Sequence, residues 1–401
     1  MSLSDKKKDQ KIGVSRIKIV IAVDSFKGSV SSLQAGEAIK NGILRVCPDR
    51  EVVVSPMADG GEGSAEAILY TLGGKKVHVN VKGPLMDSVS AEYVIFPYNG
   101  TDHVFIESAS SCGLTLIPEE RRTPMKTNTF GLGEQIKDAI KRGYRHFILS
   151  LGGSATNDGG IGMLQALGWQ FFDENGNLIG KEANPLLNTA AMSTQKVLSE
   201  IAECKFTIAN DVLNPFYGPS GAAHIFARQK GASDAEIVEL DKGLERFAWI
   251  LYKETGIDVQ EIPGAGAAGG LGGAMAACLN AKMASGAEII MELTGLKDKI
   301  QWADLVITGE GSIDQQSLLG KVPVTVAKYA KHHRKAVIGL AGRIDTELER
   351  INEHLDAVFS IQTQCRTLDE AMLEEITTKQ LEVTAEQVMR LLVNSRKIYC
   401  N

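Results

Sequence analysis

The first apolar segment of the chain constrains its fold more than any other feature. Residues 17–24 read Ile-Lys-Ile-Val-Ile-Ala-Val-Asp, a nearly continuous apolar run. Such a run is typical of a strand that is buried on both faces of a parallel sheet. A helix capped by Ser31 or Ser32 is predicted next, followed by a strand at 52–54 and a helix at 64–72. This β-α-β-α order predicts an α/β fold with a doubly wound sheet.

The same alternation returns near the end of the chain. Strands are predicted at 303–308, 336–341 and 357–361, with a helix at 322–332 and a long helix over 368–396. Because strands and helices alternate at both ends of the chain, we expect the two ends to form one sheet together.

The middle of the chain has a different pattern. Alternating segments at 76–81, 91–96 and 104–107 are typical of antiparallel strands, and Asn99-Gly100 suits a tight turn between the last two. Beyond them, we expect a long amphipathic helix at 234–254 and a closely packed small-residue helix at 269–283.

These patterns predict two domains. Residues 17–85 and 290–401 would form a discontinuous Rossmann-like parallel-sheet domain, and residues 86–289 an inserted mixed α/β domain. A cleft between them is the expected ligand site. Residues 1–16 are polar and rich in lysine, and we expect them to be a flexible extension rather than a secretory signal.

Composition excludes several classes of function. The net charge of −6 and the pI near 5.8 argue against nucleic acid or an anionic membrane as the main partner. The six cysteines have no CxxC spacing and indicate free thiols in a reducing compartment, so we expect a cytoplasmic protein. The histidines have no ligand spacing, which disfavours a zinc centre.

Polar, glycine-flanked segments follow several of the predicted strands. They are Asp24–Ser29, Asp59–Gly63, Ser154–Gly160, Asn210-Asp211 and Gly309–Asp314, with Gly320-Lys321 before a helix. Ligands of open α/β sheets bind beyond the carboxyl ends of the strands, so these segments are expected to converge. Lysines and glycine turns suit a polyphosphate, carboxylates suit Mg²⁺, and hydroxyl and amide groups suit a small hydroxylated substrate. Together they indicate phosphoryl transfer.

The segment from Leu149 to Gly160 carries most of this signal. An apolar strand breaks there into Gly-Gly-Ser-Ala-Thr-Asn-Asp-Gly-Gly, and a helix pattern follows. Unpaired N–H groups at a helix start favour an anion. The alternative is a tight turn in which Asp158 merely caps the helix. Recurrence of the same composition at other strand ends favours the functional interpretation.

Two nucleotide-binding motifs are absent or discounted. Gly264–Gly269 fits the GxGxxG dinucleotide fingerprint, but no strong strand precedes it, so we favour helix packing or close backbone approach. The segment Gly176–Lys181 is one residue too short for a Walker A motif.

The longest of these segments resemble the type-1 (bacterial) glycerate kinase family. The matching motifs are 23–29, 56–63, 152–160, Asn210-Asp211 with Asn214-Pro215, 229–232, 264–270, 308–312 with Asp314, and Gly320-Lys321. They follow the family's order from Ile17 to about Arg396. The resemblance implies ATP- and Mg²⁺-dependent phosphorylation of D-glycerate to 2-phosphoglycerate, in a cleft between a Rossmann-like domain and an inserted domain.

We assign candidate roles accordingly. The catalytic candidates are Lys27, Asp158 and Asp211, either carboxylate accepting the hydroxyl proton. The substrate-binding candidates are Ser154, Thr156, Asn157 and Lys321, with Lys27 and Lys321 each able to contact phosphate or the glycerate carboxylate. The nucleotide-binding candidates are Gly28, Gly60, Gly61, Gly309, Gly311 and Ser312. The metal-binding candidates are Asp59, Glu310 and Asp314.

Other functions stay open at this point. The enzyme could yield 3-phosphoglycerate or act on a related small hydroxy acid. Gly264–Gly269 leaves a nicotinamide-dependent oxidoreductase as an alternative, and a non-catalytic sugar-acid binding protein is another. Small molecules are the expected partners, neither nucleic acid nor a membrane is expected, and a homodimer stays open.

Overall fold

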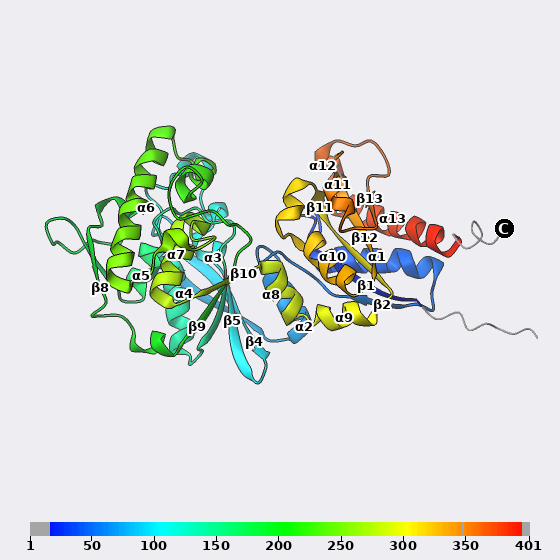
Figure 1. Cartoon of the computed structure of the whole chain (residues 1–401), viewed down its shortest axis with the longest axis horizontal. Helices are drawn as coiled ribbons and strands as arrows, with labels where there is room; N and C mark the ends of the chain where they lie inside the picture. Colours follow the sequence, from blue (N-terminus) through cyan, green and yellow to red (C-terminus); the bar gives the residue numbers. More distant parts are fainter. Residues whose placement is uncertain (1–16, 347–348, 395–401) are drawn as a thin grey trace, which may run out of the picture.

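The protein contains two main β-sheets, each with its own helices, arranged side by side (Figure 1). The structure is a computed structural model that describes residues 17–346 and 349–394, without the side chains of Gln316 and Leu319. The predicted extension at 1–16 lies outside the described residues. Both ends of the described chain belong to one body, and the middle of the chain forms the other.

The first sheet has five parallel strands in the order β13-β12-β11-β1-β2. Their bounds are β1 Lys18–Val23, β2 Glu51–Val54, β11 Leu305–Ile313, β12 Ala336–Ile344 and β13 Ala357–Ser360. Strand β1 lies between β2 and β11, with Ile21 opposite Ile307, so the two ends of the chain meet in the middle of this sheet. The prediction of one sheet from both ends is confirmed.

Strand β1 is apolar throughout because both of its faces are covered. Ile19, Ile21 and Val23 face one hydrophobic cluster, which includes residues of α1 (Ser32–Val46) and α13 (Glu374–Asn394). Val20 and Ala22 face another, which includes residues of α9 (Leu296–Trp302) and α10 (Val322–His332). Alternate side chains of a strand point to opposite faces, so each face contributes to a separate core.

The second sheet has six strands in the order β10-β9-β6-β5-β4-β3. Their bounds are β3 Lys75–Lys82, β4 Ser88–Tyr98, β5 Thr101–Glu107, β6 His146–Ser150, β9 Lys205–Ala209 and β10 Lys282–Ala284. Strands β3, β4 and β5 are antiparallel, and β5, β6, β9 and β10 are parallel. The predicted turn at Asn99-Gly100 joins β4 to β5, and both residues have positive φ, as a two-residue hairpin requires.

Helices and one further pair of strands complete this body. They are α3 Ala109–Cys112, α4 Phe130–Lys141, α5 Ile161–Ala166, α6 Asp234–Thr255 and α7 Ala267–Leu279, with β7 Gln170–Phe172 paired to β8 Ala191–Ser193. The long helix α6 begins at a capping box in which Ser233 and Glu236 satisfy each other's backbone N–H groups.

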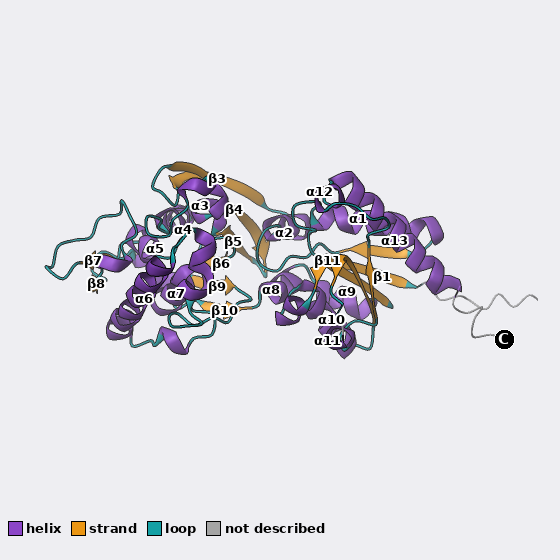
Figure 2. Cartoon of the chain, turned by 90° about the horizontal axis from the view of Figure 1, so that it is seen from above, coloured by secondary structure: helices purple, strands orange, loops and turns teal. Residues whose placement is uncertain are grey.

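Two helices lie between the sheets. Figure 2 shows α2 (Ser64–Leu72) and α8 (Gly286–Leu293) in this position. A single hydrophobic cluster joins them to Val20 of the first sheet and to Phe96 and Phe105 of the second. The two bodies are therefore connected by a packed apolar contact.

Two predicted helices have different limits in the structure. The helix expected over 368–396 is split into α12 (Leu368–Ala371) and α13, which are separated at Met372–Leu373, and residues 395–396 lie outside the described part. The helix expected over 269–283 ends at Leu279, where Asn280 adopts a left-handed conformation that turns the chain into β10. Ala281, Met283 and Ala284 follow that turn and resemble the residues of the helix, so composition did not reveal it.

The predicted fold class, a parallel α/β sheet with an inserted mixed α/β part, is confirmed. The exact domain limits remain a proposal. Strand β3 pairs with β4, so we place the first limit near residue 74 instead of 85. Helix α8 packs in the cluster that covers the first sheet, so the return lies near residue 285. None of the described helices is long and apolar enough to cross a membrane. The remaining helix, α11, spans Glu349–Asn352.

Candidate active site

The loop after β1 brings a lysine to a carboxylate from the loop after β2. Lys27 Nζ lies 3.3 Å from Asp59 Oδ2, and the N–H of Gly61 donates to Asp59 Oδ1. Burial alone would lower the pKa of Lys27, but the carboxylates of Asp59 and Asp24 outweigh it and raise that pKa. Gly28 has a φ of +76° that permits the tight turn holding Lys27 in place.

Strand β11 contributes a buried acid to the same region. Glu310 Oε1 accepts a hydrogen bond of 2.6 Å from the Ser317 hydroxyl, and its Oε2 lies 3.9 Å from Lys321 Nζ. Burial raises the pKa of Glu310, and neighbouring Asp59 and Asp314 raise it further. The Ser312 hydroxyl donates to Asp314 Oδ2 over 3.3 Å. The other two predicted metal candidates, Asp59 and Asp314, are therefore both within electrostatic reach of Glu310.

Asp24, at the end of β1, is an acid to which the sequence analysis gave no role. Its side chain is 2% exposed, and Oδ1 accepts a hydrogen bond of 2.6 Å from the N–H of Ser25. Burial, with added repulsion from Asp59 and Glu310, raises the pKa of Asp24 to about 7. Its position directly after the first buried strand is the signal that could have identified it.

A cavity of about 320 Å³ opens beside these groups. One part of its wall is polar and comes from Lys27, Glu310 and Lys321, while Ile361 and Met372 contribute apolar wall. Of the predicted nucleotide-binding residues, Gly311 and Ser312 line this cavity, and Gly28 lines a hollow of about 570 Å³ on the other side of Lys27.

The other predicted glycines serve close packing between backbones. A Cβ on Gly309 would lie 2.1 Å from the carbonyl oxygen of Leu340 in the neighbouring strand. A Cβ on Gly60 would lie 2.8 Å from Gly286 Cα, at the contact between the two bodies. Gly61 is close to Gly152, so the loop that holds Asp59 reaches the loop after β6. This contact links the two halves of the candidate site.

The loop after β6 holds the predicted substrate-binding residues. Ser154, Thr156 and Asn157 are buried, and Lys230 Nζ donates to Ser154 Oγ over 3.1 Å and to the Thr156 carbonyl over 2.7 Å. Thr156 Oγ1 and both polar atoms of the Asn157 amide are buried without a hydrogen-bond partner. Buried polar groups are normally paired, so these atoms are candidates for contact with a ligand.

Asp158 has a different environment from the other candidate catalytic acid. It is fully buried, Oδ2 accepts hydrogen bonds from the N–H and hydroxyl of Thr129 and the N–H of Gly162, and Oδ1 accepts from the N–H of Gly160. Burial raises its pKa and these donors oppose the rise. The carboxylate ties α4 to the start of α5, which corresponds to the structural alternative considered from the sequence.

Asp211 lies after β9 and keeps one oxygen free. Oδ1 accepts a 3.0 Å hydrogen bond from the N–H of Gly286, while Oδ2 is buried without a hydrogen-bond partner. Burial raises the pKa of Asp211 to about 6. The neighbouring Ser285 hydroxyl and the N–H of Gly286 oppose this rise, and repulsion from Asp59 adds to it. Asp211 therefore lies within electrostatic reach of Asp59, which comes from the loop after β2.

The GxGxxG segment packs against the loop after β6. A Cβ on Gly269 would lie 2.2 Å from the carbonyl oxygen of Thr156, and one on Gly266 would lie 2.2 Å from that of Pro215. Ala268, Gly269 and Gly270 all have positive φ. These glycines allow backbone segments to approach closely, as the packing interpretation predicted.

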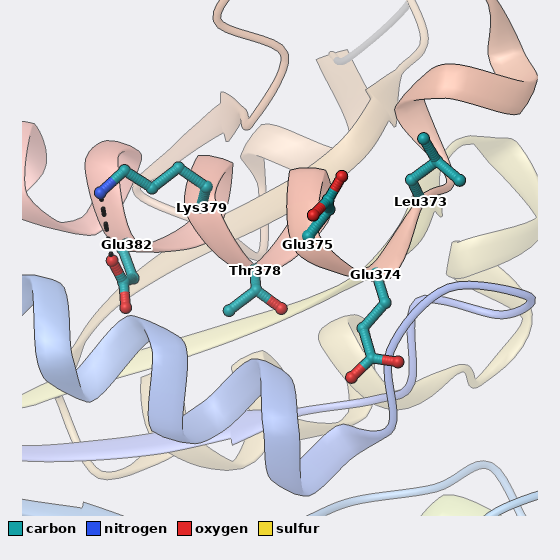
Figure 3. Close-up of a pocket in the computed structure, with 6 residues that line it drawn as sticks. All are labelled: Leu373, Glu374, Glu375, Thr378, Lys379 and Glu382. Atoms are coloured by element: carbon teal, nitrogen blue, oxygen red, sulfur yellow. Dashed lines mark ion pairs between the residues drawn. The ribbon is translucent and has the colours of Figure 1, made fainter.

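A hollow of about 650 Å³ lies along α13 (Figure 3). Its side chains come from α13 and the residue before it, and Lys379 pairs with Glu382 across 3.6 Å. No strand end contributes to it, and we do not assign it to the site. Within the described residues, no group of three His, Cys, Asp or Glu side chains is already arranged around a metal position.

Comparison with known proteins identifies relatives over nearly the whole chain. Residues 19–393 match the model of the glycerate kinase family. A glycerate kinase of Halalkalibacterium halodurans is 46% identical over 356 residues, 88% of this chain and 93% of the relative. A glycerate 2-kinase of Escherichia coli is 45% identical over 356 residues, with the same two shares. A crystal structure described as glycerate kinase 2 of Salmonella typhimurium LT2 has a TM-score of 0.84 and 40% identity, covering 95% of this chain and 99% of that one.

Proposed function

The chain belongs to the glycerate kinase family and is a kinase, and from this premise we propose that it transfers the γ-phosphoryl group of ATP to D-glycerate, with Mg²⁺, to give 2-phosphoglycerate. The observation that carries the nucleotide and metal part is the cavity at the end of the first sheet, where two lysines and several carboxylates meet. The nicotinamide alternative finds no support, because its glycine motif is occupied by packing.

The cavity suits a nucleotide because one part of its wall is apolar and another part is positively charged. Ile361, Leu368 and Met372 offer an apolar surface for a base, and Lys27 and Lys321 offer charge for phosphates. Ligand pockets commonly combine an apolar lining with a few polar groups that fix orientation. We place the phosphates next to Gly311 and Ser312, on the side of Glu310.

The carboxylates fit a divalent cation. Asp24, Asp59 and Glu310 repel one another across the site, as the raised pKa values of Asp24 and Glu310 indicate. Mg²⁺ takes oxygen ligands and is commonly held by one or two carboxylates together with substrate phosphates and water, so a preformed three-carboxylate cluster is not required. Asp59, Glu310 and Asp314 would hold it, and it would neutralise phosphate charge during transfer.

The acceptor site is proposed at the loop after β6. Ser154, Thr156 and Asn157 would orient glycerate through their hydroxyl and amide groups. Asp211 would accept the proton of the attacking hydroxyl, because its Oδ2 has no hydrogen-bond partner. Asp158 is left out of this role, since both of its oxygens already accept hydrogen bonds from the surrounding protein.

The product and the location of the enzyme are also part of the proposal. Phosphorylation at the 2-hydroxyl is suggested by the name of the Escherichia coli relative, a glycerate 2-kinase. A cytoplasmic location agrees with the free cysteines among the described residues.

ADP release measured with D-glycerate, L-glycerate and a panel of sugar acids tests the reaction, and ³¹P NMR of the product separates 2-phosphoglycerate from 3-phosphoglycerate. Lys27→Met should lower kcat/KM by about 10²-fold or more, as expected for loss of a positioned charge on the phosphates. Lys40→Met removes a surface pair with Glu37 on α1 and should change nothing. Absence of ADP release with every acid, from a protein that binds ATP, would overturn the proposal.

A further inference from the structure

A lysine is buried beneath the proposed acceptor loop. Lys230 is 3% exposed and lies before Gly231, in a short helical segment that precedes α6. A lysine almost never buries its ammonium unless that group is paired, because removing the charge from water is costly. The position of Lys230 therefore calls for an explanation beyond packing.

The ammonium of Lys230 has few partners. It donates to Ser154 Oγ and to the carbonyl of Thr156, and the carboxylate of Asp158 raises its pKa through charge attraction. Asp158 in turn is engaged by donors from Thr129, Gly160 and Gly162. Burial dominates and lowers the pKa of Lys230 to about 7. The ammonium is thus incompletely compensated in the free protein.

Unpaired polar groups lie on the same loop as the two atoms to which Lys230 donates. Thr156 Oγ1 and the Asn157 amide are buried without a hydrogen-bond partner, on the residues next to the Thr156 carbonyl. The loop begins at Gly152, beside Gly61 and the Asp59 turn. Hydroxyl, amide and positive charge are the features that a small hydroxy acid would match.

We propose that Lys230 is a positioning residue that makes the 154–157 loop selective for an acceptor with a carboxylate, by holding Ser154 and Thr156 in place and supplying the compensating positive charge. This inference rests on the proposed function, since it concerns the acceptor of that reaction. It assigns the preference for a hydroxy acid over an uncharged polyol or amide to one side chain, which donates to Ser154 and Thr156.

The proposal has a consequence for proton uptake. An anion bound near Lys230 favours its charged form, so binding raises the pKa of this lysine and takes up protons near pH 7. Affinity for glycerate should therefore weaken as pH rises above 7, by about fivefold between pH 7 and pH 8 if the bound form stays protonated. An uncharged acceptor such as D-glyceramide should not show this dependence.

Isothermal titration calorimetry of the wild-type protein with D-glycerate, without nucleotide, in two buffers of different ionisation enthalpy measures the uptake directly. The carboxyls of Asp24 and Asp211, with pKa values of about 7 and about 6, would also take up a proton beside an added anion, so only the uptake that is lost in Lys230→Met belongs to Lys230. We expect proton uptake with glycerate and none with glyceramide.

Variants then separate charge from packing. Lys230→Met should raise the KM for glycerate at least tenfold, make the KM values of glycerate and glyceramide similar, and remove the pH dependence of glycerate affinity. Lys230→Arg should keep the preference for glycerate and weaken that pH dependence. Lys299→Met is a matched control. Lys299 is part-buried, and its Nζ donates to Ser55 Oγ and the Thr294 carbonyl, neither of which belongs to the acceptor loop. It should lower stability without changing acceptor preference.

Each result decides one question. Equal proton uptake with both acceptors, or an unchanged glycerate preference in a folded Lys230→Met protein, would overturn the role of Lys230 and leave the kinase proposal intact. If Lys230→Met does not fold, calorimetry of Lys230→Arg decides, because a guanidinium stays protonated and removes any proton uptake that belongs to this position. If the wild type fails to phosphorylate glycerate, the proposed function fails, while binding of glycerate against glyceramide still tests Lys230.

Discussion

Replacing Asp158 by Asn separates a structural carboxylate from a catalytic one. The carboxylate accepts hydrogen bonds from Thr129, Gly160 and Gly162, at distances of 2.9 to 3.1 Å. An amide offers one acceptor oxygen, so its NH₂ group must face at least one of these donors. Hydrogen bonds to a charged group contribute about 1.5–3 kcal/mol each. Loss of one or two, plus a buried donor left facing a donor, predicts about 3–5 kcal/mol of destabilisation.

The matched variant is Asp211→Asn. The Asn oxygen can still accept from the N–H of Gly286, and its NH₂ group can donate to the neighbouring Ser285 hydroxyl. Stability should change by less than about 1 kcal/mol. The rate should fall by about 10²–10⁴-fold, because an amide cannot accept the hydroxyl proton.

Urea denaturation followed by circular dichroism measures stability, and coupled ADP detection measures kcat on the fraction that is folded. The reasoning is refuted if folded Asp158→Asn keeps its stability and loses activity, or if Asp211→Asn retains near wild-type kcat. The first outcome would return Asp158 to the chemistry, and the second would move the base elsewhere, with Asp24 as the next acid to test.

Three further predictions follow from individual contacts. The pKa of Asp24 is raised to about 7 in the folded state, so its contribution to stability is greatest at low pH and is lost as pH rises through 7. Asp24→Asn should therefore have a larger free energy of unfolding than the wild type at pH 8. An excess that grows toward pH 5 in urea titrations would contradict this. Gly269→Ala should lower the free energy of unfolding in urea by about 2 kcal/mol or more, because its Cβ would meet the Thr156 carbonyl. Gly143 also has a positive φ but has open space around it, so Gly143→Ala should lower that free energy by only about 1 kcal/mol. Leu368→Glu should raise the KM for ATP and leave the KM for glycerate unchanged in steady-state kinetics, and equal effects on both would argue against a base-binding role for this part of the cavity.

The elements of the first sheet were predictable because their burial leaves a simple pattern. Strand β1 is covered on both faces, so it reads as a continuous apolar run, and Ser31 forms the predicted kind of cap before α1. The turn at Asn99-Gly100 was likewise predictable from the sequence, since few residue pairs adopt a positive φ at both positions. The end of α7 was not, because residues similar to those of the helix follow the Asn280 turn.

The convergence of strand ends was also predictable, and the direction of each side chain was not. Lys27, Asp59 and Glu310 meet because β1, β2 and β11 are parallel and end at one edge of the sheet. Asp24 directly follows its buried strand and Asp158 precedes a helix, but neither position shows which groups its carboxylate faces. Their difference comes from distant contacts: Thr129 engages Asp158, whereas acids from other loops face Asp24.

Lys230 illustrates the same limit from the opposite direction. In sequence it is one of several lysines beside a glycine, and the ordinary expectation for lysine is exposure to solvent. Only the fold shows that its ammonium reaches 74 and 76 residues back along the chain, to the Thr156 carbonyl and Ser154 Oγ. The strand-end rule identifies the loops that form a site, but a cation that supports such a loop from beneath lies outside that rule. Buried lysines near unpaired polar atoms are therefore worth testing as determinants of substrate charge, and Lys230→Met measured with glycerate and glyceramide is the direct test in this enzyme.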